Sequence, residues 1–146
     1  QLKTLILFGN KLKSVSDVEK AVFIENKFEI NKIFFQIFNQ TKFIISIFNK
    51  NIYSQSDFYF FLNTVKMYID IMSSSSTKEE VLKKLPKYLF NEKEVFMKIF
   101  NSLNDDKLKT IYRNIYKVEN IVRYNSSMFN VVGLRFFLNT KKIITS

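Results

Sequence analysis

The clearest pattern in the chain is a repeat of apolar residues at helical spacing between residues 57 and 72. Apolar side chains at i, i+3, i+4, i+7, i+11 and i+14 lie on one face of an α-helix, and Asp57 or Ser56 could cap its start. These positions are Phe58, Phe61, Leu62, Val65, Ile69 and Met72. The segment is therefore predicted to be an amphipathic helix.

Similar spacing, with capping residues at the segment starts, predicts further helices along the chain. Thr77 followed by Glu80 forms a capping box, Pro86 interrupts the helix after it, Asn91 begins the next with Glu94 at its third position, and Asn104 precedes another. The predicted helices cover residues 17–38, 41–52, 57–72, 77–85, 92–103, 106–124 and 127–139. Residues 1–10 could be a helix end or a docking strand.

Composition supports the same fold class. The 146 residues include only two Gly and one Pro, whereas a fold built from many tight turns needs more of both. Hydrophobic residues make up 47% of the chain, which is ample for a core. We predict one all-α domain over residues 1–146, a bundle of about seven or eight helices. The Ser73–Ser76 run could divide it into two packed sub-bundles.

No catalytic chemistry can be recognised in the sequence. The chain contains no Cys and no His, which excludes thiol nucleophiles, Ser-His-Asp sites and the commonest transition-metal ligands. Its acidic pairs fall at predicted helix starts, where they complement the helix dipole; they are Glu79/Glu80, Glu92/Glu94 and Asp105/Asp106. Most Phe residues fall on apolar stripes and are expected in the core. We predict a non-enzymatic protein with no cofactor and no metal.

The net charge of +10 permits three kinds of partner: nucleic acid, anionic lipid or an acidic protein. Nucleic acid ranks last among the functions considered, because the Lys residues are scattered rather than clustered. The abundance of Lys, Asn, Ile and Phe together is typical of an AT-rich genome. No run of 18 apolar residues is present, but the chain begins with Gln1 and resembles a fragment, so an anchor could lie outside it.

Part of the chain resembles a known family. Tyr68-Ile69-Asp70 ends a predicted helix, Leu89-Phe90 is followed by Glu94-Val95-Phe96, and Leu103 precedes Leu108–Tyr116. With Glu119 and Arg123-Tyr124, this succession resembles the cytoplasmic domain of the DotU/IcmH/TssL family, an inner-membrane component of type VI and type IVB secretion systems. The resemblance covers residues 63–124. Ile71 stands where the family has Glu, and the family's Trp and Gly residues are missing.

The resemblance implies a hook-like helical bundle followed by a C-terminal membrane helix, which the basic Lys141-Lys142 end would suit. Its implied role is a scaffold on the cytoplasmic face of the bacterial inner membrane, linking a membrane complex to cytoplasmic components. Partners would be other protein subunits, with a homodimer as a further form. The alternative is a viral helical inhibitor of host apoptosis or signalling, which would hold a partner helix in the host cytoplasm.

Three residues are predicted to contact a partner under the scaffold interpretation: Asp70, Arg123 and Tyr124. Asp70 is unusual because an acid near a helix C-terminus is disfavoured by the dipole. It could instead be a plain surface acid, or pair internally with a cation, Arg113 or Arg123, with Tyr124 packed beside it. The Ser73–Ser76 loop next to Asp70 is polar, and we expect it to be mobile and to order on binding.

Overall fold

A computed structural model describes residues 14–16, 30–36 and 43–146. The predictions for residues 1–10 and for most of 17–38 lie outside the described residues. Within the described parts, residues 30–36 are helical and no strand occurs, which confirms the all-α fold class. The chain then runs through α3 (Ile44–Asn51), α4 (Gln55–Ser73), α5 (Lys78–Lys84), η1 (Lys87–Glu92), α6 (Lys93–Ser102), α7 (Asp105–Tyr124), η2 (Ser126–Met128) and α8 (Phe129–Thr145).

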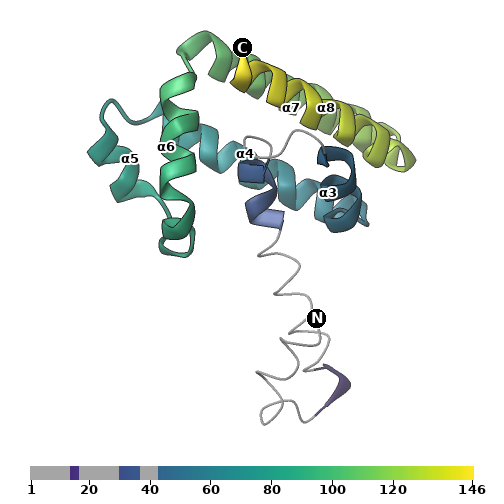
Figure 1. The fold of residues 1–146 in the computed structure, drawn as a ribbon. Coiled ribbons are helices and arrows are strands. Elements are labelled where there is room, and N and C mark those ends of the chain that lie inside the picture. The colour runs from purple at the N-terminus through teal and green to yellow at the C-terminus, as the bar shows by residue number, and fades with distance from the viewer. Residues whose placement is uncertain (1–13, 17–29, 37–42) are drawn as a thin grey trace.

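Figure 1 shows how these helices are arranged around α4. The long helix α4 passes through the middle of the molecule, α7 and α8 run as a pair along one side of it, and α5 and α6 lie at its C-terminal end. Helix α7 packs against both α8 and α4, and α8 also contacts α3 and α6. None of the helices in the described ranges has the length and apolar character needed to cross a bilayer.

Helix α4 owes its start to local hydrogen bonding. The cap is Ser54, rather than Asp57 or Ser56 as predicted. The Ser54 hydroxyl accepts from the Asp57 amide at 3.1 Å, and the Asp57 carboxylate accepts from the Ser54 amide at 3.0 Å. This reciprocal pair satisfies two amides that the first turn would otherwise leave unpaired. The helix consequently starts two residues before its predicted first residue.

The predicted apolar stripes form the core. All six stripe residues of α4 are buried, as are Leu108, Ile111, Ile115, Val118 and Val122 of α7. Aromatic rings fill the spaces between helices in two groups. The first group is Phe48, Phe58, Phe61, Phe136 and Phe137, and the second is Phe34, Phe35, Tyr68 and Phe96. The assignment of these Phe residues to the core is therefore confirmed.

The predicted boundaries of α8 and α6 were also wrong. Helix α8 does not stop at residue 139 but continues through Thr145, because Thr140 and Ile144 extend its buried face. Asn91 does not begin a helix. After Pro86 the chain forms the short 3₁₀ helix η1, and α6 starts at Lys93 with Glu92 at its cap and no side-chain cap bond. Pro86 cannot donate the amide hydrogen bond that a continuous helix needs there.

Candidate functional site

The acidic pairs lie at helix starts, where their charge complements the helix dipole, and Glu80 also takes part in capping. Glu79 and Glu80 lie in the first turn of α5, Glu94 in that of α6, and Asp105 with Asp106 in that of α7. The Thr77 hydroxyl accepts from the Glu80 amide at 3.3 Å. The Glu80 carboxylate reaches back to the amide of Ser76 at 2.8 Å, and this bond lowers the pKa of Glu80. These carboxylates therefore stabilise helix ends.

Polar side chains of α4 and α7 meet in a network along the line where the two helices pack. The Tyr112 hydroxyl donates to Asp70 Oδ1 at 2.8 Å, and Lys66 Nζ forms a salt bridge with Glu119 Oε1 at 2.5 Å. Lys66 Nζ also lies 5.2 Å from the centre of the Tyr116 ring, a cation–π distance. The Tyr112 and Tyr116 rings are 5.6 Å apart. We call these five residues the α4–α7 network.

The network explains the position of Asp70. Its side chain is exposed, and it has no cation within salt-bridge distance in the part of the chain that the structure describes. The alternative of an internal pair with Arg113 or Arg123 is therefore wrong, and Asp70 contacts Tyr112 instead. Hydrogen bonding to Asp70, followed by burial, raises the pKa of Tyr112 to about 12.

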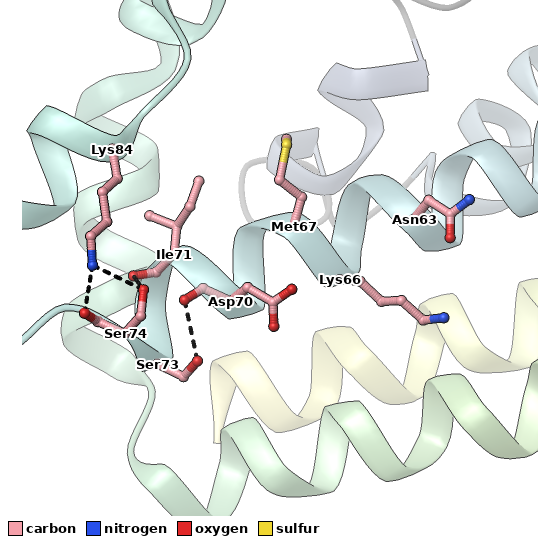
Figure 2. Close-up of a pocket in the computed structure, with 8 residues that line it drawn as sticks. All are labelled: Asn63, Lys66, Met67, Asp70, Ile71, Ser73, Ser74 and Lys84. Atoms are coloured by element: carbon pink, nitrogen blue, oxygen red, sulfur yellow. Dashed lines mark hydrogen bonds between the residues drawn. The ribbon is translucent and has the colours of Figure 1, made fainter.

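The C-terminal half of α4 borders an open groove of about 560 Å³. Figure 2 shows its lining: Asn63, Lys66, Met67, Asp70, Ile71, Ser73, Ser74 and Lys84. Lys84 of α5 donates to the Ser74 carbonyl at 2.6 Å and to the Ser74 hydroxyl at 3.0 Å. The last turn of α4 contains no basic residue of its own. The Lys84 ammonium therefore supplies the positive charge that stabilises the C-terminal end of this helix.

Serine hydroxyls of the loop after α4 form hydrogen bonds with the last turn of that helix. Ser75 is buried, and its hydroxyl donates to the Ile71 carbonyl at 2.7 Å. Ser73 and Ser74 donate to the carbonyls of Asp70 and Ile71. The Asp70 carbonyl also accepts from the Ser74 amide at 3.0 Å, whereas the Ile71 carbonyl is satisfied by serine hydroxyls at the end of α4.

The structure does not bring the three predicted partner-binding residues together. Asp70 lies beside Tyr112, whereas Arg123 and Tyr124 follow about three turns later on α7, roughly 16 Å along the helix axis. All three are exposed, and Tyr124 is 88% exposed. Sequence reasoning assigned no role to Lys66, Tyr112 or Tyr116, although Tyr112 and Tyr116 are four residues apart and so lie on one face of a helix.

The α4–α7 network offers little scope for acid–base chemistry. The Lys66 ammonium and the Glu119 carboxylate neutralise each other. Asp70 accepts a hydrogen bond from the Tyr112 hydroxyl, which is itself a weak acid. Within the described residues, no group of three or more acidic side chains could hold a metal ion. The network is therefore best described as a set of polar contacts that join α4 to α7, with one face open to solvent.

Comparison with known proteins identifies no relative: no family model, no curated protein and no solved structure matches this chain.

Proposed function

We propose that this chain is a non-enzymatic helical domain that works by contacting other proteins. More specifically, we propose a scaffold subunit of a bacterial secretion apparatus, on the cytoplasmic face of the inner membrane. The specific part rests on the resemblance of residues 63–124 to the DotU/IcmH/TssL family. The general part rests on the surface at the turn between α7 and α8.

The observation that carries the proposal is the apolar tip of the α7–α8 hairpin. Tyr124 is 88% exposed, Ile121 is 45% exposed and Met128 is 39% exposed, all within eight residues of chain. Tyrosine and methionine are enriched at protein interfaces, and Arg123, another interface-favoured residue type, stands exposed beside Tyr124. A partner that covered this tip would remove apolar surface from water, which favours association.

Asp70 supports the proposal as a second, separate contact point. Only its Oδ1 accepts a hydrogen bond within the described chain, so Oδ2 can accept one from a partner. Tyr116, 55% exposed, lies nearby in the α4–α7 network. Because Asp70 and Tyr124 lie on different parts of the surface, a partner would reach both only if it extended along α7.

Site-directed photo-crosslinking in the source cell tests the general proposal. A photoreactive phenylalanine replaces Tyr124 in the full-length protein, and the same residue replaces Tyr53, which is 67% exposed before α4, as the matched control. We expect protein adducts at 124 that are absent at 53. If position 124 gave no protein adduct, or both positions gave the same set, the proposal would be refuted.

The secretion role has its own test. We expect the full-length reading frame to encode an apolar segment of about 20 residues after Ser146, and deletion of the gene to abolish export of secreted effector proteins. A reading frame without such a segment would contradict the scaffold proposal but leave the general one standing. Adducts of position 124 with a host death-motif helix would instead favour the viral inhibitor.

A further inference from the structure

The outer face of α8 carries apolar and basic residues in alternation. Val131, Arg135, Leu138 and Lys142 follow one another at intervals of four, three and four residues, so they lie on one face of the helix. All four are exposed, Val131 by 68% and Leu138 by 43%. We call these four residues the outer stripe of α8. It extends over about three turns, roughly 16 Å.

The C-terminal part of the chain, which includes the stripe, carries mostly positive charge. Residues 107–146 contain eight basic residues and a single acid, Glu119. Glu119 is already paired with Lys66. Neither Arg135 nor Lys142 has a carboxylate within salt-bridge distance among residues 30–36 and 43–146. The stripe therefore presents two cations with no anionic partner in the described fold, next to two aliphatic side chains.

The alternation favours a protein helix over lipid or nucleic acid. A helix that lies in a membrane surface has a broad apolar face, with its basic residues on the polar side, whereas here the cations share the stripe with the aliphatic residues. Nucleic acid would meet Arg135 and Lys142 with its phosphates but would bury Val131 and Leu138 against charged groups. A partner helix with aliphatic and acidic residues in alternation matches both features.

We propose that the outer stripe of α8 docks an acidic amphipathic helix of a partner protein. Its aliphatic side chains, spaced seven residues apart, would pack against Val131 and Leu138, and its carboxylates would pair with Arg135 and Lys142. This inference deepens the proposed protein-contact function and rests on it. It names a further surface, apart from the α7–α8 tip and Asp70, on the side of α8 that faces away from the core.

The fold presents this stripe on a fixed helix. The opposite face of α8 is anchored by Phe136, Phe137 and Ile144, all buried, and by Gly133, which lies against the rings of Phe48 and Phe58. A partner helix would therefore bind a preformed surface. The same separation means that substitutions in the outer stripe should leave the core, and the folded state, intact.

The experiment measures binding of a labelled peptide of about 20 residues by fluorescence anisotropy, at about 0.15 M salt. The probe is a helix with Leu at positions seven apart and Glu between them on the same face. A permuted peptide has the same composition but places Leu and Glu on opposite faces. We expect the wild-type protein to bind the first peptide at least about tenfold more tightly than the second.

Matched variants localise the binding. R135E/K142E and L138S are each expected to weaken binding at least about tenfold. K78E/K93E makes the same change in net charge on α5 and α6, and L82S replaces another partly exposed leucine. These two controls should change affinity by less than about twofold. Circular dichroism of every variant confirms that its helices remain.

Three results would overturn the inference: equal affinity for the two peptides, no binding of either, or equal losses in the stripe and control variants. Vesicles of phosphatidylcholine with phosphatidylserine, and a DNA duplex, are measured in parallel. Tighter binding of either one, abolished by R135E/K142E, would assign the stripe to lipid or nucleic acid. Because crosslinking at position 124 probes another surface, these failures can be told apart from failure of the proposed function.

Discussion

The Tyr112 hydroxyl donates a hydrogen bond to the Asp70 carboxylate at 2.8 Å, joining the first half of α7 to the last turn of α4. The bond gives a partner to an acid that the helix dipole disfavours at that position. It also opposes ionisation of the phenol, because a phenolate could not donate and would face a second negative charge. Both effects depend on how α4 and α7 pack.

This bond predicts a pH-dependent contribution to stability. The folded pKa of Tyr112, about 12, is above its ordinary value of 10.0. The contribution is therefore fully present below about pH 10 and is lost as the pH rises through about 12. We expect Y112F to lower the free energy of unfolding by about 0.5–1.5 kcal/mol at neutral pH. The difference from wild type should shrink above about pH 10 and vanish only above about pH 12, as followed by urea denaturation.

Variants of Asp70 test the same bond from its other side. D70N keeps an acceptor but removes the charge, so the pKa of Tyr112 should return toward 10 in an ultraviolet titration of the phenols. Charge reversal, D70K, should cost about 1 kcal/mol, far less than the roughly 3–5 kcal/mol expected of a broken buried pair. A loss of that larger size would contradict the exposed position of Asp70.

The Lys66–Glu119 pair should stabilise the packing of α4 on α7. Both side chains are mostly covered, with 23% and 14% of their surfaces exposed, so solvent screens the pair only partly. A double-mutant cycle with K66M and E119Q is expected to give a coupling free energy of about 1 kcal/mol. The coupling should decrease in high salt. A value near zero at low salt would show that the pair adds nothing to stability.

Gly133 should resist substitution even by alanine. A Cβ atom added there would lie 2.6 Å from Phe58 Cε2 and 2.7 Å from Phe48 Cζ, so both rings would have to shift. Overpacking costs about 1–3 kcal/mol, which exceeds the gain of about 1 kcal/mol in helix propensity. We expect G133A to unfold at lower urea, and F48L to recover part of that loss. Greater stability of G133A would contradict the close packing.

Thr140 offers a route to higher stability. Its side chain is fully buried, and its hydroxyl has no hydrogen-bond partner within the described structure. Replacing that hydroxyl with a methyl group removes the cost of desolvating it, so T140V is expected to raise the free energy of unfolding by about 1 kcal/mol. T140S keeps the hydroxyl and loses the methyl group, so thermal unfolding should show a lower midpoint. Destabilisation by T140V would indicate an unseen partner.

The sequence by itself determined the fold class and most helices of the described region. The apolar spacing of α4 and α7 and the capping roles of Thr77 and Asn104 can be read locally, because a helix end is stabilised by side chains three or four residues away. Burial of the Phe stripes follows from the same periodicity. The absence of His and Cys is likewise a property of the chain alone.

Only the tertiary structure decided which residues meet. Whether Asp70 pairs with Arg123 or with Tyr112 depends on the register between α4 and α7, and that register is set by side-chain packing distant in sequence. The outer stripe of α8 could not be predicted from the sequence for a related reason. Its segment is apolar nearly all round in sequence, and only the packing of α8 on α3, α4, α6 and α7 determines that Val131 and Leu138 face solvent.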